Sequence, residues 1–329
     1  MRTSLKMLLI VNVLCNLQAA MCFSQQYADT TVSIMPADSV DADKNSLLKT
    51  YLKRKFLTGT VSVVGLGSTF ISLNNSWYKQ YDKVPFHTFN DAAEWLQMDK
   101  MGHAWTAYNS SFLIYKMWRW AGVKRNNAIL LGGLTGLGYL TTIEYLDGRS
   151  AGWGWSWSDM GANIFGISLF AIQQAAFNNQ AIRIKFTTHN KQYPGQMKAR
   201  ADELFGKSFS SNLLKDYNAQ TYWLSLNLQS FFPKSKLPQW LNIAIGYGAE
   251  GMLGGFNNKK YDDNGLLIFD ASDTKRYRQL YFSPDIDLSK INTRSKFVKS
   301  LLNTLNVIKI PFPAVEYSNG RLKTHLFYF

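Results

Sequence analysis

Cysteine is nearly absent from this 329-residue sequence: the chain has two, Cys15 and Cys22, and both lie near its N-terminus. The rest of the sequence therefore offers no disulfide framework, no thiolate zinc site and no cysteine nucleophile. It also contains no phosphate-binding glycine loop, no nucleophile elbow and no zinc-protease helix motif. The common signatures of nucleotide enzymes, serine hydrolases and zinc proteases are thus missing.

The N-terminal residues have the pattern of a signal peptide over residues 1–24. Arg2 and Lys6 precede a short apolar run over residues 7–13, and small residues follow as far as Ser24. The apolar run is too short for a permanent membrane anchor, so we expect cleavage after Ser24 and export into the envelope of a diderm bacterium. Lipidation of Cys22 is the alternative, but the residue before it fits that signal poorly.

The net charge of +14 is concentrated in the C-terminal half, where residues 181–329 contain 21 Lys and Arg against 11 Asp and Glu. An exported chain rarely meets nucleic acid. We therefore expect membrane lipid or lipopolysaccharide as partners, and no nucleic acid. A basic surface that serves only solubility is the other interpretation.

The hydrophobic pattern divides the chain into a polar leader over residues 25–44, a helical part over 45–179 and a basic, strand-rich part over 180–329. Apolar helices are predicted over about 46–73, 90–121, 127–146 and 159–178, with Asn90 as an N-cap, Gly122 just beyond a C-terminus, and Ser156 or Ser158 as a further cap. Glycines on the third helix indicate close helix contacts. Strands are predicted over 183–188, 221–228, 241–252, 278–288 and 321–329, with a helix over 294–306.

The predicted fold class is therefore α+β, a bundle of about four apolar helices followed by a strand-rich region. The last strand ends on Phe329, as the closing strand of an outer-membrane β-barrel does. A barrel of this kind needs about eight strands. The sequence has only five or six candidates, which favours an ordinary open sheet over a barrel.

Three of the apolar helices each contain a pair of polar residues with helical spacing: Asp99 with His103, Glu144 with Asp147, and Asp159 with Asn163. Ionisable groups in apolar surroundings need partners, or their pKa values shift. These pairs are the strongest chemical signal in the sequence, and three interpretations are open.

In the first interpretation the set binds a divalent metal through His103 and the carboxylates of Asp99, Glu144, Asp147 and Asp159, which suits zinc, manganese or magnesium. In the second, His103 is a general acid or base oriented by Asp99 or Glu144, while Arg149 and Asn163 contact an anionic or polar substrate. In the third, the set is a buried structural network in which Asp159 caps a helix and Glu144 pairs with Arg149 or Lys100.

The same residues carry a resemblance to a known family. Asp-Lys-Met-Gly-His (99–103), Glu-Tyr-Leu-Asp-Gly-Arg (144–149) and Gly-Trp-Ser-Trp-Ser-Asp-Met-Gly-Ala-Asn-Ile-Phe-Gly (154–166) resemble the YfiM-type family of envelope lipoproteins. More distantly, the order of these segments is similar to VanZ-like membrane proteins. The resemblance covers about residues 90–177 and implies that Asp99, His103, Glu144, Asp159 and Asn163 are the matching polar positions. It implies no established activity.

The sequence therefore predicts an outer-membrane-associated envelope protein with a site for a metal or an anionic lipid or glycan between apolar helices. The first alternative is a hydrolase or transferase that acts on envelope lipid or glycan with His103 as base. The second is a structural or assembly partner of an outer-membrane complex. Outer membrane and periplasm both remain open as the location.

Overall fold

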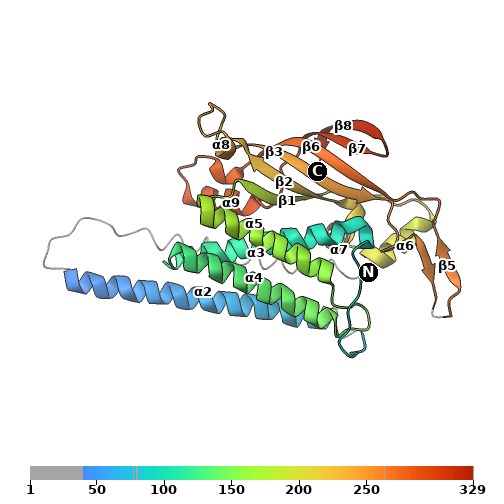
Figure 1. Ribbon diagram of the computed structural model, residues 1–329, viewed down its shortest axis with the longest axis horizontal. Helices are drawn as coiled ribbons and strands as arrows, with labels where there is room; N and C mark the ends of the chain where they lie inside the picture. Colours follow the sequence, from blue (N-terminus) through green and yellow to red (C-terminus); the bar gives the residue numbers. More distant parts are fainter. Residues whose placement is uncertain (1–39, 77, 79–80, 263, 329) are drawn as a thin grey trace.

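The computed structural model describes residues 40–76, 78, 81–262 and 264–328, and it joins a layer of long helices to a six-stranded antiparallel sheet (Figure 1). This arrangement confirms the predicted α+β class. The predicted signal peptide and residues 25–39 of the predicted leader lie outside the described residues. Residues 40–44, also predicted as leader, are helical, so that part of the prediction is wrong.

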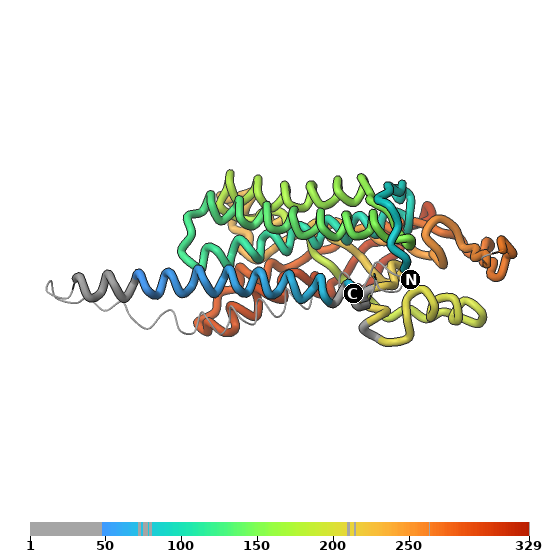
Figure 2. The backbone as a smooth tube through the Cα atoms, turned by 90° about the horizontal axis from the view of Figure 1, so that it is seen from below, coloured from blue at the N-terminus to red at the C-terminus, as the bar shows by residue number. Residues whose placement is uncertain are grey.

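The long helices lie side by side along the length of the molecule (Figures 1 and 2). They are α2 (Val40–Ser76), α3 (Met98–Trp120), α4 (Arg125–Asp147) and α5 (Trp157–Phe177). α3 contacts each of the other three. Each helix coincides with one of the predicted apolar segments, and Gly122 has the positive φ predicted just beyond the end of α3.

The start of α3 differs from the prediction. Asn90 does not cap this helix; it lies in a loop, where its side chain accepts a hydrogen bond from the backbone N–H of Ala92. A 3-10 turn, η3 (Glu94–Gln97), comes first, and the left-handed backbone at residues 95–97 separates it from α3. Tertiary contacts stabilise this kink, since Trp95 is buried against Tyr217 and the hydroxyl of Tyr247 donates a hydrogen bond to the backbone at residue 96.

Glycines allow the helices to approach closely, as predicted. A Cβ atom added to Gly136 of α4 would collide with the hydroxyl of Ser111 on α3, and one added to Gly132 would lie 2.6 Å from the carbonyl oxygen of Ser111. Gly166 of α5 lies equally close to the backbone of α3. Gly138, by contrast, faces open space.

The sheet has the strand order β1-β2-β3-β6-β7-β8, and all neighbouring strands are antiparallel. The strands are β1 (Ile182–Thr188), β2 (Gln220–Asn227), β3 (Leu241–Glu250), β6 (Tyr277–Ile286), β7 (Phe312–Ser318) and β8 (Arg321–Tyr328). All but β7 coincide with predicted strands. β7 was not predicted, and it contains Pro313, a residue that sheets admit mainly at edges and irregular positions.

Shorter elements connect the strands. They are α6 (Gln196–Phe205), α7 (Phe209–Lys215), η4 (Tyr217–Ala219), α8 (Leu228–Phe231), the hairpin β4 (Lys259–Tyr261) and β5 (Leu267–Asp270), η5 (Leu288–Lys290) and α9 (Lys296–Leu305). Of these, only α9 was predicted, over 294–306.

The sheet is strongly curled. β2 and β8 are four places apart in the strand order, which would separate them by roughly 19 Å in a flat sheet. Nevertheless, the hydroxyl oxygens of Thr221 on β2 and Tyr328 on β8 lie 2.9 Å apart. Within the described residues β8 does not pair with β1, and so no closed barrel is found.

The two faces of the curled sheet have unusual polarity. The inner face is buried and largely polar, and it contains an ion pair between Lys185 and Asp285, whose nitrogen and oxygen lie 2.7 Å apart with no solvent exposure. The outer face is covered by α3 at β1 and β2, where Trp105 packs on Phe186. Farther along, on β3, β6, β7 and β8, apolar side chains of this outer face are exposed.

The helices and the sheet share one buried core. Trp105 and Tyr108 of α3 belong to the same hydrophobic cluster as Ile184 and Phe186 of β1 and Tyr222 of β2. The helical and strand-rich parts therefore pack directly on each other, and η4 of the strand-rich part lies beside the first turn of α3.

Candidate functional site

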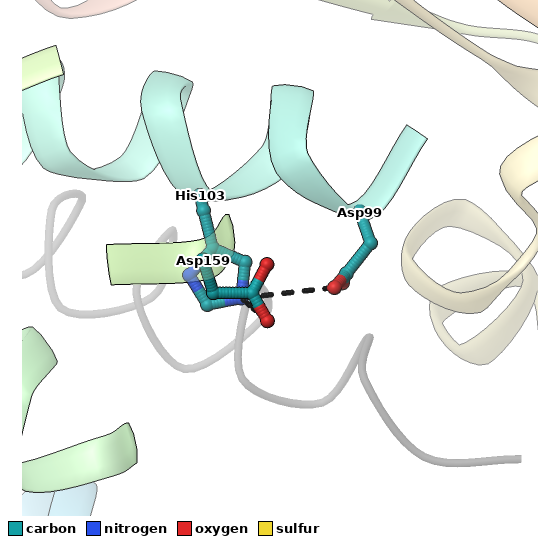
Figure 3. A group of neighbouring side chains, drawn as sticks. All are labelled: Asp99, His103 and Asp159. Carbon is teal, nitrogen blue, oxygen red and sulfur yellow. Dashed lines mark ion pairs between the residues drawn. The ribbon is translucent and has the colours of Figure 1, made fainter. Parts of the chain in front are cut away.

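The polar pairs on the separate helices converge at the end of the helical layer where α3 begins. Asp99 and His103 project from the same side of α3, and Asp159 reaches them from α5 (Figure 3). The i, i+4 spacing of Asp99 and His103 places both on one helix face. One ligand atom from each of these three residues lies within 4.8 Å of the others, a group able to hold a metal ion.

The imidazole of His103 faces a different set of atoms with each nitrogen. Its Nε2 lies 3.7 Å from Oδ2 of Asp159 and 4.0 Å from Oδ2 of Asp99, both longer than a hydrogen bond. Its Nδ1 lies 3.1 Å from Oδ1 of Asn163 and 3.7 Å from Oε1 of Glu144. Asn163 is one turn beyond Asp159 on α5, so the predicted pair on that helix contacts both sides of the ring.

Each carboxylate near Nε2 is held through its other oxygen. Oδ1 of Asp99 accepts a hydrogen bond of 2.6 Å from the hydroxyl of Tyr217 in η4. Oδ1 of Asp159 lies 2.6 Å from the ammonium of Lys100. The two Oδ2 atoms are turned toward the imidazole of His103, and Oδ2 of Asp99 also accepts a hydrogen bond of 3.2 Å from Lys100.

Lys100 is the main counter-charge of the site. Besides Asp159, its ammonium lies 2.8 Å from Asp91 and 3.2 Å from Asp99, and its side chain is 8% exposed. Burial by itself would raise the pKa of Asp91, but the hydrogen bond and charge of Lys100, with the hydroxyls of Ser156 and Ser158, lower it below its ordinary value.

Ser156 organises the start of α5. Its hydroxyl accepts a hydrogen bond from the backbone N–H of Asp159, which makes it the N-cap and confirms one of the two predicted caps. Its own backbone N–H donates to Oε2 of Glu144 at 3.4 Å, and its hydroxyl donates to Asp91. The helix cap thus links the carboxylates of Asp91 and Glu144 to the first turn of α5.

A cavity of about 570 Å³ opens beside these residues. Its lining is strongly acidic, with Arg200 as the basic residue among the described lining residues. The carboxylates that line it are Asp91, Glu94, Asp99, Glu144, Asp147, Asp159 and Glu203. Burial, and then the negative charges of Asp99 and Asp91, raise the pKa of Glu94 to about 7.

Other predicted site residues lie at different distances from His103. Glu144 is 1% exposed and lies beside the imidazole. Asp147 lines the same cavity, but its Oδ1 accepts a hydrogen bond of 2.9 Å from Tyr78 and it is not one of the residues grouped around Nε2 of His103. Arg149 is exposed and is not among the residues that line the cavity.

Several residues of the site were not predicted as members. Asp91 and Glu94 were not in the predicted set, and Lys100 was predicted only as a possible partner of Glu144. Their closeness in sequence to Asp99 was a usable signal for a larger acidic cluster. Tyr217 and Arg200 had no such signal, because tertiary packing alone brings the strand-rich part to this end of α3.

The charges at the site do not balance. Asp91, Asp99, Glu144 and Asp159 are each at most 7% exposed, and Lys100 and His103 are cations beside them. Among the residues that the structure describes, these four carboxylates outnumber the two cations even when the imidazole is protonated. Buried carboxylates in excess must bind protons or a cation, so the arrangement is chemically suited to holding a positively charged ligand.

Residues 88–175 match the sequence model of a family described as "Predicted periplasmic lipoprotein (DUF2279)". The matched segment covers about a quarter of the chain and includes η3, α3, α4 and almost all of α5. It supports the prediction of an exported envelope protein similar to a lipoprotein family. The searches of curated proteins and of solved structures returned no match. The finer resemblance to YfiM-type and VanZ-like proteins stays a prediction.

Proposed function

We propose that this envelope protein binds a divalent metal ion through Asp99, His103 and Asp159 at the wall of the acidic cavity. The observation that carries the proposal is the convergence of Nε2 of His103 with Oδ2 of Asp99 and Oδ2 of Asp159, at separations longer than hydrogen bonds. One nitrogen and two carboxylate oxygens suit zinc or manganese.

The two separations from Nε2 fit a metal with little adjustment, and the two carboxylate oxygens lie within 4.8 Å of each other. Zinc bonds of about 2.0–2.2 Å place tetrahedral neighbours roughly 3.3–3.6 Å apart. The distances of 3.7 and 4.0 Å from Nε2 therefore need to shorten by only a few tenths of an ångström.

The surroundings of the three residues also resemble those of metal ligands. Metal-binding histidines usually donate their second ring N–H to an oxygen, and Nδ1 of His103 faces the amide oxygen of Asn163. Tyr217 and Lys100 hold the outer oxygens of the two carboxylates. Lys100 then remains as a counter-charge, and the ion adds positive charge where the described carboxylates outnumber the described cations.

The acidic lining favours a cation over the anionic lipid or glycan that the sequence also allowed. An anionic ligand would meet the carboxylates of Glu94, Glu144 and Asp147, with Arg200 as its basic contact in the lining. Repulsion between like charges at these distances would oppose binding. Lipid and lipopolysaccharide therefore fit poorly inside this cavity.

A second candidate function, metal-dependent hydrolysis, is favoured by the number of ligands. Structural zinc sites usually have four protein ligands, while catalytic sites have three and leave a position for water or substrate. The group around His103 has three members and adjoins a cavity of about 570 Å³. Turnover of an uncharged ester or glycoside that requires added metal and disappears in His103→Ala would support this function.

The direct test is the metal content of the purified full chain after exchange into zinc or manganese and removal of unbound ion. We expect about one equivalent in the wild type, and a loss of most of it in His103→Ala and Asp159→Asn. His87→Ala is the matched control, because His87 lines the same cavity but is not in the group around Nε2. Equal metal content in wild type and His103→Ala, with both proteins folded by circular dichroism, would contradict the proposal.

A further inference from the structure

Apolar side chains are exposed over the outer side of the helical layer. Val63 of α2 is 73% exposed, Leu134 of α4 is 64% exposed, and Phe165 of α5 is 52% exposed. α4 and α5 are long and apolar enough to cross a membrane, and only 39% and 33% of their most apolar stretches are buried. A core helix of a soluble protein would be mostly buried, so these helices have an outer face without a protein cover in the described chain.

The sheet lies on the side of the molecule away from α2 (Figure 1), and its outer face also exposes apolar side chains. Ile245 of β3 and Phe282 of β6 are paired neighbours, and both are about half exposed. Leu326 of β8 is 83% exposed. Most inward side chains are polar and surround a small buried cluster that includes Trp223, Tyr281 and Tyr328, while the outward ones are largely apolar, as in sheets that face lipid.

The dimensions of both sides match a bilayer. α4 and α5 have 23 and 21 residues, about 32–34 Å, and the hydrocarbon core of a bilayer is about 30 Å thick. β3 and β6 have ten residues each, within the 9–11 of a tilted spanning strand. Charged residues are absent from residues 56–76 of α2, 126–143 of α4 and 160–177 of α5.

One end of this apolar body is strongly basic. Four segments, 49–55, 116–125, 234–236 and 290–299, contain fourteen Lys and Arg and no Asp or Glu. Contacts place them together: the guanidinium of Arg54 lies 5.3 Å from the ring of Trp120, and Lys116 lines one small cavity with Asn303, just beyond the last segment. Lys290 donates a hydrogen bond to Ser230, close to the third segment. We call these four segments the basic end.

The basic end and the acidic cavity lie at opposite ends of the long helices. α3 begins at the cavity and finishes at the basic end, and α4 runs back. From this geometry we infer that the protein is embedded in a bilayer of anionic phospholipid. The outer faces of the helices and sheet contact the acyl chains, and the basic end lies among the lipid phosphates of one leaflet. A juxtamembrane basic cluster attracts anionic lipid in this way.

Lipid explains these observations better than a protein partner does. A second copy or a single partner would cover one apolar patch, whereas exposed apolar side chains occur both on α2, α4 and α5 and on the sheet, which lies on the side away from α2 (Figure 1). Soluble proteins rarely expose apolar patches this extensive. The basic end adjoining both sides is complementary in charge to phosphate headgroups.

Quenching of fluorescent labels by brominated lipid tests whether the helical side and the sheet side both lie in the bilayer. Single-cysteine variants Phe165→Cys, on the helical side, and Phe282→Cys, on the sheet side, would be labelled with an environment-sensitive fluorophore in the full chain with Cys15 and Cys22 replaced by serine. This replacement also removes any lipid anchor. In vesicles of phosphatidylcholine and phosphatidylglycerol, we expect acyl-chain-brominated lipid to quench both labels several-fold more strongly than a label at Lys207→Cys, an exposed residue outside the basic end.

A second experiment tests the attraction between the basic end and anionic lipid. Lys53→Gln and Lys124→Gln should each lower the partitioning of the chain into phosphatidylglycerol-containing vesicles by about fivefold, with little change for phosphatidylcholine alone. Lys207→Gln and Lys275→Gln, both exposed outside the basic end, should change neither. Unquenched labels on a chain that is monodisperse in buffer would overturn the inference. A stable dimer that shields both labels without lipid would overturn it as well.

Discussion

Nε2 of His103 lies 3.7 Å from Oδ2 of Asp159, across the contact between α3 and α5, and Asn163 of α5 holds the other side of the same imidazole. One helix therefore supplies both a candidate co-ligand and the group that orients the ring. Gly166, one turn farther along α5, packs against the backbone of α3 without room for a side chain. Close helix packing and the geometry of the site are thus coupled.

The orienting role of Asn163 can be separated from its role in packing. Asn163→Leu removes the oxygen that faces Nδ1 of His103, and we expect metal affinity to fall by about 10–100-fold, as for other second partners of metal-bound histidines. Asn163→Asp keeps an acceptor at this position and should recover most of the affinity. Competition with a chromophoric chelator measures both. Wild-type affinity in a folded Asn163→Leu protein would show that Asn163 does not orient the ring.

Lys100 should be essential to the stability of the metal-free protein. Lys100→Met leaves Asp91, Asp99 and Asp159 without their common counter-charge, and removing one partner from a buried ionic group costs about 3–5 kcal/mol. Lys198→Met is the control, because Lys198 forms an exposed pair with Asp202 that is worth less than about 1 kcal/mol.

The cost of Lys100→Met should depend on pH. Lys100 helps to lower the pKa of Asp91 below 3.8, so its contribution is present above that value and is lost as the pH falls through the lowered pKa. Equilibrium unfolding without metal, at neutral pH and in strong acid, measures the difference. Added zinc or manganese should recover part of the lost stability at neutral pH. A cost for Lys100→Met no larger than that for Lys198→Met would contradict a stabilising role of the buried ion pairs around Lys100.

Glu94 should make the protein less stable as the pH rises. Its pKa is raised from 4.5 to about 7, so the folded state holds a proton that the unfolded chain releases, and stability falls between these two values. A shift of this size corresponds to at most about 3 kcal/mol. Glu94→Gln should remove this fall, which unfolding experiments at several pH values can detect.

Glu203 lines the same cavity as Glu94, but its pKa is shifted in the opposite direction. Although burial acts to raise its pKa, hydrogen bonds from Lys260 and Arg200 lower it, so Glu203 stabilises the folded state above its ordinary pKa. Glu203→Gln should therefore leave the fall between pH 4.5 and about 7 unchanged. If both variants show the same pH profile as the wild type, Glu94 is not the group responsible.

Local patterns in the sequence were sufficient to predict most of the helices and strands. Apolar runs located α3, α4 and α5, Ser156 marked the start of α5, and helical spacing selected the polar pairs, of which all members but Asp147 lie beside His103. The same patterns failed at the start of α3, because the left-handed turn at residues 95–97 depends on contacts with Tyr217 and Tyr247, more than a hundred residues later in the chain. Such contacts have no local signature.

The reversed polarity of the sheet shows a second limit. The alternation of residue types in β6 predicted a strand, but an alternation with a period of two does not reveal which set of side chains faces inward. Only the curling that brings Thr221 to Tyr328 shows that the polar set is enclosed. The position of Lys185 beside Asp285 depends on the same long-range pairing.

The contact between α3 and α4 can be tested with two glycines of the same helix. Gly136→Ala introduces a Cβ atom against the hydroxyl of Ser111 of α3, whereas Gly138→Ala places one in open space. Overpacking at Gly136 should destabilise the protein by about 1–3 kcal/mol. At Gly138, alanine should be neutral or stabilising by up to about 1 kcal/mol, because alanine reduces the conformational freedom of the unfolded chain and favours a helix more than glycine does. Thermal unfolding of the two variants measures this difference in stability.

Ser111→Ala, combined with Gly136→Ala, should recover part of the lost stability, since it removes the hydroxyl oxygen that the new methyl group meets. Equal effects at the two glycines would mean that α4 does not approach α3 as closely as the structure places it.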